Sequence, residues 1–395
     1  MIDFFRRTLG KENVSEEKAD LEVYATDSSR INGVTRLVVW PENAKQIHQI
    51  ILFAKRANLN LIFRGAGTNM VGAVVPRNSV VIDMGKMNKI LDVGKDYIVV
   101  EPGINVSEIN RALRDMFFPI VTEKSGVASI GGLISMNASC DRTMKFGTIK
   151  DWVLETEIID GTGRTRKTKD VIGKEGMLGA IIKAKLKLTY KISETSLSVF
   201  KFNTSEELSE KVLELKNNEN ILSLKILNEL SAKLIGLEEK YYLVAEYLGT
   251  EGKIVNKEEK EKILKKLDIL RSVLNSKGFI YEEDIKVSGE NLAEFLYWAK
   301  HKKVPCFGNV GHDSIHPFLK SREDAKSLYD MVLKLNGELI GEYGVGYLKK
   351  NVASNKLKEE IIELKKKYDP NCIMNIGKLI EKEDIKIEDK KRKRK

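Results

Sequence analysis

The chain has 395 residues, with 67 Lys and Arg against 57 Asp and Glu, which gives a formal net charge of +10. With 42% hydrophobic and 31% charged residues it can bury a substantial core, which excludes wholesale disorder. Its length predicts two domains, with room for a third small one. No apolar run reaches the roughly 18 residues of a membrane-spanning helix. The order of charges in residues 1–7 is not that of a signal peptide, and three scattered cysteines exclude a disulfide framework or an iron–sulfur spacing. A cytoplasmic protein is therefore expected.

Short runs of strand-forming residues, separated by glycine-rich breaks, characterise the chain from about residue 36 to 190. Strands are predicted at residues 36–40, 60–63, 79–82, 97–100 and 182–190. Apolar residues at helical spacing predict a helix over residues 41–56, with Pro41 at its start, and a second helix over residues 105–116.

After Tyr190 strands alternate with long, charged helices. The predicted strands are 197–202, 241–248, 279–285, 304–309 and 315–319. The predicted helices are 205–215, 256–274, 291–302, 323–335 and 355–368. This alternation indicates a separate α+β domain in which helices cover a sheet.

Residues 63–76, Phe-Arg-Gly-Ala-Gly-Thr-Asn-Met-Val-Gly-Ala-Val-Val-Pro, follow a predicted strand. A turn with little side-chain bulk presents successive backbone N–H groups, which suit a phosphate or pyrophosphate. The segment is not a Rossmann fingerprint, because Met70 occupies the place of the third glycine. It is not a Walker loop either, because Ala73 and Val74 follow the last glycine. Glycines alone would equally suit a tight turn.

Together with other motifs, this loop resembles the pyrophosphate loop of the FAD-linked oxidase family, the vanillyl-alcohol oxidase or PCMH-type flavoproteins. The likeness extends from about residue 20 to 380. Its further motifs are Thr26-Asp27, Val-Val-Trp-Pro at 38–41, Val-Glu-Pro-Gly at 100–103, Ser-Ile-Gly-Gly at 129–132, Met-Asn-Ala at 136–138, Lys-Phe-Gly at 145–147, Asp160-Gly161 and Gly-Lys-Glu-Gly at 173–176. Residues 369–378, which include Asp-Pro-Asn and Asn-Ile-Gly-Lys, are similar to the closing motif of the glycolate oxidase and D-lactate dehydrogenase branch.

The resemblance implies an α+β protein: a two-domain PCMH-type FAD-binding fold with an α+β, ferredoxin-like substrate cap. The FAD-binding domain is expected over residues 1–190 and the cap over residues 191–340. Residues 341–382 are expected to pack back near the flavin, and residues 383–395 to form a basic, disordered tail.

The implied cofactor is FAD. The residues that match the family's cofactor-binding positions are Arg64, Gly65, Ala66, Gly67, Thr68, Asn69, Gly72, Pro76, Gly131, Gly132, Asn137, Gly147, Asn375 and Lys378. Two departures are Ser139-Cys140, where the family has Gly-Gly, and Ile376, which replaces a common proline. Neither adds a charge, so FAD binding is expected to survive.

At the catalytic end the match is incomplete. The 2-hydroxyacid dehydrogenase branch has two metal-binding histidines seven residues apart and a later Glu-His pair, whose histidine takes the hydroxyl proton. Here Asn309 occupies the first ligand position, His316 the second and Glu342 the third, and Tyr343 stands where the base should be. A phenol, with an ordinary pKa of about 10, is a poor proton acceptor.

Two interpretations remain open. In the first, His312 serves as ligand or base, so that His312 and Tyr343 are catalytic, while His316, Glu342 and Asn309 hold a divalent metal. In the second, the metal is lost and the chemistry differs from the family's usual reaction. The cap arginine with which the family often clamps a carboxylate is not recognisable. Arg271 is expected on a solvated helix face, and Lys286 offers only a point charge.

The predicted function is oxidation of a small 2-hydroxy acid, such as D-lactate or glycolate, by hydride transfer to FAD. The alternative is a flavoprotein subunit, or a divergent flavoenzyme acting on another substrate, because Asn309 and Tyr343 replace the usual histidines. The expected partners are a small-molecule substrate and a separate electron acceptor, such as an iron–sulfur protein, quinone or cytochrome. A homo-oligomer is compatible with the sequence, and no nucleic acid is expected.

The last six residues, 390–395, are all Lys or Arg. Without them 61 basic residues face 57 acidic ones, so the basic excess belongs largely to this end of the chain. It is expected to be a solvated tail or to make weak, peripheral contact with an anionic membrane surface.

Overall fold

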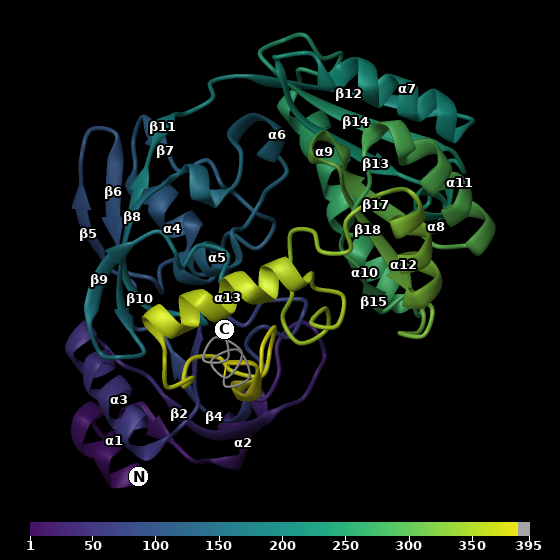
Figure 1. The fold of residues 1–395 in the computed structure, drawn as a ribbon. Helices are drawn as coiled ribbons and strands as arrows, with labels where there is room; N and C mark the ends of the chain where they lie inside the picture. Colours follow the sequence, from purple (N-terminus) through teal and green to yellow (C-terminus); the bar gives the residue numbers. More distant parts are fainter. Residues whose placement is uncertain (386–395) are drawn as a thin grey trace. The chain divides into compact units, whose positions relative to one another are not determined.

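The computed structural model describes residues 1–385, whose course is drawn in Figure 1. They form two compact units. The first comprises residues 1–138, 148–190 and 343 onward, and the second comprises residues 139–147 and 191–342. The sequence predicted one continuous first domain up to residue 190. The structure instead assigns residues 139–147 to the second unit, and the basic end beyond residue 385 lies outside the described residues.

A four-stranded sheet forms the first half of the first unit. Its strand order is β1 (Val14–Ser15), β2 (Val34–Val39), β4 (Arg77–Asp83) and β3 (Leu61–Arg64). β2, β4 and β3 run parallel, and β1 is antiparallel to β2. Helix α3 (Ala44–Ala57) connects β2 to β3 and buries Ile47, Ile50 and Ile51 against the sheet. It begins at Ala44 with Asn43 as its N-cap, and not at Pro41 as predicted, because the Asn43 side chain accepts a hydrogen bond from the Gln46 N–H group.

An antiparallel five-stranded sheet forms the second half of the first unit. Its order is β5 (Ile90–Val93), β6 (Tyr97–Val100), β10 (Gly179–Lys187), β8 (Val153–Asp160) and β9 (Thr165–Thr168). The alternation predicted after Ile182 is present in β10, where Ala184 and Leu186 are fully buried and Lys187 is exposed. Buried residues of β8 and β10 join the core made by α3 and the parallel strands.

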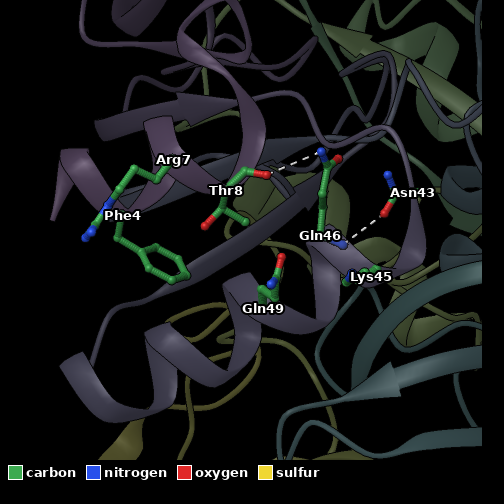
Figure 2. Close-up of a pocket in the computed structure, with 7 residues that line it drawn as sticks. All are labelled: Phe4, Arg7, Thr8, Asn43, Lys45, Gln46 and Gln49. Atoms are coloured by element: carbon green, nitrogen blue, oxygen red, sulfur yellow. Dashed lines mark hydrogen bonds between the residues drawn. The ribbon is translucent and has the colours of Figure 1, made fainter.

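The remaining elements of the first unit are short apart from the last helix. They are α1 (Ile2–Leu9), α2 (Lys18–Val23), α4 (Val106–Ala112), α5 (Ile130–Met136), α13 (Asn355–Tyr368) and the strand pair β7 (Met116–Phe117) and β11 (Thr189–Tyr190). A surface hollow of about 540 Å³ lies between α1 and α3 and is lined by residues such as Arg7, Lys45 and Gln46 (Figure 2). None of the predicted site residues lines it.

The second unit is built on one antiparallel sheet, whose strands differ in length. Its main order is β12 (Thr195–Phe202), β14 (Tyr241–Leu248), β13 (Ile221–Leu227), β17 (Cys306–Asn309), β18 (Ser314–Leu319) and β15 (Tyr281–Glu282), with β16 (Ile285–Lys286) also paired to β18. The central strand β13 is almost wholly buried and was not predicted from the sequence.

Helices cover both faces of this sheet. α7 (Ser205–Lys216), α11 (Leu292–Lys302) and α12 (Ala325–Lys334) pack on one face. α8 (Glu229–Leu234) and α10 (Leu270–Ser276) pack on part of the other. α9 (Lys257–Asp268) buries no residue, and the predicted single helix 256–274 is divided between α9 and α10. α6 (Thr143–Phe146) lies against β13 within this unit. None of the helices in residues 1–385 has the length and hydrophobicity needed to cross a bilayer.

Candidate functional site

The glycine loop of the first unit begins where β3 ends, at Arg64. Gly67 and Gly72 have φ values of 69° and 78°. Residues with a Cβ atom adopt such values only with strain. Within residues 1–385 the backbone N–H groups of residues 65–70 donate no hydrogen bond. A run of unused N–H groups on a glycine-rich turn is a concave site for an anion.

The Arg64 side chain packs against the glycine loop at Gly67. Its guanidinium would overlap a Cβ atom placed on Gly67, and it donates a 2.7 Å hydrogen bond to the Thr26 carbonyl oxygen. It also stacks on the Tyr24 ring at 5.2 Å. Burial lowers the pKa of Arg64, while Asp27 and Asp83 oppose that shift. The predicted role of Arg64 as a cofactor-binding residue is therefore compatible with a loop-supporting position.

A second loop lies against the first. Ser129 is the N-cap of α5, and its Oγ atom occupies the space that a Cβ atom on Gly65 would need. Gly131 is held by close packing on Pro102, and its N–H group donates to the Pro102 carbonyl oxygen. The N–H group of Gly132 donates to Ser129 Oγ at 3.3 Å. Both N–H groups are therefore used within the chain, and these glycines contribute close backbone approach.

Asn137 and Gly147, the other two residues predicted to bind the cofactor here, lie in different units. Asn137 ends α5 with φ 49°, and its Oδ1 atom accepts hydrogen bonds from Thr148 and Lys150. Gly147 ends α6 with φ 70° and belongs to the second unit. The structure therefore groups Asn137 with the glycine loop in one unit but not Gly147.

The closing motif binds the far end of the glycine loop. The Asn375 side chain donates to the carbonyl oxygens of Ala73 and Glu175 at 2.9 and 2.6 Å. Its Oδ1 atom is buried without a hydrogen-bond partner in residues 1–385. Lys378 is 1% exposed and donates to the Val75 carbonyl oxygen. Burial lowers its pKa to about 8, and the charge of Arg77 adds to that shift.

These features test whether the residues fit FAD. The unused N–H groups of the loop suit a pyrophosphate. The glycines let the two loops pack closely on each other, and the Asn375 Oδ1 atom is buried without a donor among residues 1–385. Residues of the first unit that would hold FAD are therefore those of the loop at 65–70, together with Asn375 and Lys378.

In the second unit, Glu342 lies between two histidines. His316 is in β18 and His312 is in the 3₁₀ turn Val310–His312, between β17 and β18. His312 Nε2 is hydrogen-bonded to Glu342 Oε1, and His316 Nε2 lies 3.6 Å from Glu342 Oε2. His312 Nδ1 is buried without a hydrogen-bond partner in residues 1–385.

Charge stabilises this cluster. Burial opposes the charged form of His316, but Glu342, then Glu282 and Asp284, outweigh it and raise the pKa of His316. Burial would raise the pKa of Glu342, yet hydrogen bonds and charge from His312 and His316 lower it well below its usual range. Glu342 is therefore a carboxylate at neutral pH.

Asn309 and Tyr343 form hydrogen bonds with residues other than His312, His316 and Glu342. The Asn309 amide donates to Asp141 Oδ1 at 3.2 Å, and its Oδ1 atom has no hydrogen-bond partner in the described chain. Tyr343 starts the last part of the first unit, where its carbonyl oxygen accepts a 3.2 Å hydrogen bond from Asn69. Among residues 1–385, no three His, Cys, Asp or Glu side chains are arranged to hold a metal ion.

Two cationic residues near β18, Arg271 and Lys286, are paired with carboxylates. The expectation of a solvated Arg271 is wrong, because its guanidinium makes two hydrogen bonds to Glu282. Glu282 in turn lies 3.6 Å from His316 Nδ1. Lys286 lies 3.6 Å from Glu338. Glu282 was not predicted as a site residue, because it stands in a charged stretch and belongs to no motif.

Comparisons with known proteins show the family of the chain. Residues 35–169 match the family described as FAD binding domain, and residues 194–379 match the C-terminal domain of FAD linked oxidases. The glycolate oxidase subunit GlcD of Bacillus subtilis is 25% identical, over 95% of this chain and 95% of its own. The D-lactate dehydrogenase of Archaeoglobus fulgidus is 24% identical, over 88% of this chain and 91% of its own.

Two further proteins extend the comparison. The mitochondrial D-2-hydroxyglutarate dehydrogenase of Arabidopsis thaliana is 24% identical, over 96% of this chain and 81% of its own. A solved structure of alkyldihydroxyacetonephosphate synthase matches with a TM-score of 0.71 at 17% identity, over 95% of this chain and 84% of that one. It shows that the fold is the predicted two-domain PCMH-type fold. The chain therefore belongs to the FAD-linked oxidase family and is an FAD-dependent oxidoreductase.

Proposed function

We propose that the chain oxidises the hydroxyl group of a small 2-hydroxy acid, with His312 as the base that takes the hydroxyl proton. The observation that carries the proposal is the binding of Glu342 between His312 and His316. The names of the three relatives support the substrate class, because glycolate, D-lactate and D-2-hydroxyglutarate are all small 2-hydroxy acids.

The carboxylate of Glu342 supports proton transfer by His312 in two ways. Because it is bonded to Nε2, it favours the tautomer whose lone pair is on Nδ1, the atom without a partner in residues 1–385. It also stabilises the imidazolium that forms when Nδ1 takes a proton. The phenol of Tyr343 is a poorer base, so we assign Tyr343 the role of a hydrogen-bond partner for the substrate.

The proposed reaction breaks the C–H bond beside the hydroxyl group and forms a carbonyl group. When bound, FAD supplies the two-electron acceptor for the hydride. The hydroxyl proton goes to His312 Nδ1, and the raised pKa of His316 favours a positive charge beside Glu342. The three cysteines are far apart in sequence and buried, which is not the spacing of an iron–sulfur cluster site. Electrons then leave to a separate acceptor, such as an iron–sulfur protein, quinone or cytochrome.

No step is assigned to a metal. His312 Nε2 is engaged with Glu342, and within residues 1–385 no three His, Cys, Asp or Glu side chains are arranged to hold a metal ion. An amide oxygen is also a weaker ligand than imidazole for a transition metal. Dialysis against EDTA is expected to leave flavin reduction unchanged, and a stoichiometric metal that is lost from the His316→Ala variant would contradict this.

A second candidate is oxidation of an alcohol without a carboxylate. It is favoured by the pairing of the cap arginines, because Arg271 binds Glu282 and Arg142 binds Glu246, each through two hydrogen bonds. A carboxylate substrate would have to be recognised by other groups.

Anaerobic mixing separates the two candidates. FAD-loaded protein is mixed with D-lactate, L-lactate, glycolate and D-2-hydroxyglutarate, and in parallel with the corresponding diols and hydroxy amides. We expect at least one hydroxy acid to bleach the flavin absorbance and the matched neutral alcohols not to do so. Bleaching by the neutral alcohols alone would favour the second candidate, and bleaching by none would overturn both.

A further inference from the structure

Glu175 belongs to the Gly-Lys-Glu-Gly motif at residues 173–176, for which neither the sequence nor the proposed mechanism supplies a role. It is 6% exposed and has a φ of 50°. Its carboxylate accepts two backbone hydrogen bonds, from Val345 N–H to Oε1 at 2.7 Å and from Gly346 N–H to Oε2 at 2.9 Å. One carboxylate thus holds two consecutive N–H groups, those of the second and third residues after Tyr343.

Residues 343–348 can be bound by Glu175 only because their backbone comes close to its carboxylate. Residues 343–348 contain no helix or strand, so no regular hydrogen-bond ladder fixes them. A Cβ atom on Gly344 would lie 2.5 Å from Met136 Cε and 2.7 Å from Glu175 Oε1, and one on Gly346 would overlap the Val71 carbonyl oxygen. Both glycines also have positive φ values, of 80° and 50°. Glycine at these places lets the backbone reach Glu175 and the glycine loop.

The glycine loop holds the other side of the same segment. Asn69 donates to the Tyr343 carbonyl oxygen at 3.2 Å, and its Oδ1 atom accepts from Val71 and Ala73 N–H groups. The Val71 carbonyl oxygen accepts from Tyr347 and Leu348 N–H groups at 2.8 and 3.1 Å. Residues 343–348 are therefore held between Glu175 and the loop that would bind FAD.

A carboxylate is the side-chain group best suited to bind the N–H groups of both Val345 and Gly346. It offers two acceptor atoms and no donor, whereas an amide offers one acceptor and turns an NH₂ group toward the second N–H group. Burial raises the pKa of Glu175, but the two N–H groups and the nearby charge of Lys378 act against that shift. Asn375 adds a hydrogen bond to the Glu175 carbonyl oxygen, which ties the closing motif to the same point.

We propose that Glu175 is a positioning residue, which fixes the backbone of Tyr343 on the glycine loop by holding the N–H groups of Val345 and Gly346. The inference rests on the proposed function, because it assigns Tyr343 a place at the substrate. The carboxylate of Glu175 binds backbone N–H groups of its own unit, so its proposed role is to position Tyr343 and not to react.

The test compares Glu175→Gln with Gly344→Ala, which crowds the same contact without changing a charge. The matched control is Glu229→Gln, because Glu229 is also 6% exposed but lies in α8 of the second unit. Hydrogen exchange is measured on FAD-loaded protein without substrate. Both test variants should speed exchange in residues 343–348 by about tenfold or more, and the control should leave that segment unchanged.

Steady-state kinetics then distinguish positioning from general damage. With an active hydroxy acid, the test variants should lose about tenfold in kcat, while KM changes less than about threefold and FAD stays bound. Unchanged exchange in residues 343–348, or accelerated exchange with unchanged kcat, would overturn the inference. If no hydroxy acid reduces the wild-type flavin, the proposed function fails, whereas the exchange measurement still decides whether Glu175 holds this segment.

Discussion

Arg271 donates two hydrogen bonds, of 2.7 and 2.9 Å, to the carboxylate of Glu282, whose side chain is only 3% exposed. Removing the guanidinium would leave a buried charge without its main counterion, beside His316. Arg271→Met is therefore expected to lower the free energy of unfolding by about 3 kcal/mol, measured by urea titration. The double variant with Glu282→Gln should recover most of that loss, because the carboxylate that lost its counterion is then also removed. An equal loss in both variants would contradict the argument.

The pairing of His316 with Glu342 predicts a definite pH dependence of stability. The pKa of His316 is raised above 6.5 in the folded state, so its contribution is present below pH 6.5 and is lost as the pH rises through the raised value. The pKa of Glu342 is lowered below 4.5, so its contribution is present above pH 4.5 and is lost as the pH falls. The difference in urea midpoint between wild type and His316→Asn should be largest between pH 4.5 and 6.5 and should shrink as the pH rises through the raised pKa of His316. A difference independent of pH would rule out a charged pair.

Lys378 is expected to cost stability in the absence of FAD. Its pKa falls from 10.5 to about 8, so burying its charge costs about 3 kcal/mol at neutral pH. FAD-free Lys378→Met should therefore be more stable than FAD-free wild type at pH 7, and the gap should narrow from about pH 8 toward 10.5 as the wild-type amine loses its proton. FAD affinity of the variant should fall, which a fluorescence titration measures. Lower stability of the FAD-free variant would contradict the prediction.

Gly67 and Gly236 form a matched pair for testing the loop. Both have positive φ, of 69° and 76°, but a Cβ atom on Gly67 would collide with Arg64, whereas nothing lies within 4 Å of one on Gly236. Gly67→Ala should weaken FAD binding about tenfold or more, because loss of one hydrogen bond to a charged phosphate costs about 1.5 kcal/mol. Gly236→Ala should cost about 1 kcal/mol of stability through backbone strain alone. Equal FAD affinity in the two variants would argue against the loop as the binding site.

Much of the fold follows from local patterns. The helix at α13 has the predicted bounds 355–368, and β14 has the predicted bounds 241–248, because charged helices and apolar strands differ clearly in their periodicity. β13 was missed although it is central. Its sequence Ile-Leu-Ser-Leu-Lys-Ile-Leu is apolar on both faces, so it lacks the alternation by which a half-exposed strand is recognised.

The site was predictable only where motifs carry it. The glycine loop, Asn375 and Lys378 belong to the family's pattern, and the structure groups them in one unit. The contacts of Glu175 with Val345 and Gly346 join residues about 170 positions apart. Such a pairing leaves no periodic trace in one sequence. The Arg271–Glu282 pair was likewise hidden, because a paired charge and a solvated charge look alike in a sequence.

Residues 139–147 have a consequence for how this protein can be divided. In the second unit Arg142 binds Glu246 through two hydrogen bonds, and Asp141 binds Lys225 and Asn309. The sheet of that unit therefore obtains part of its polar lining from a piece of chain encoded far upstream of Lys191. A gene fragment cut at residue 191 would separate Glu246 from its arginine. Shuffling of caps among such enzymes, in the laboratory or in evolution, requires exchange of two separate stretches of sequence together.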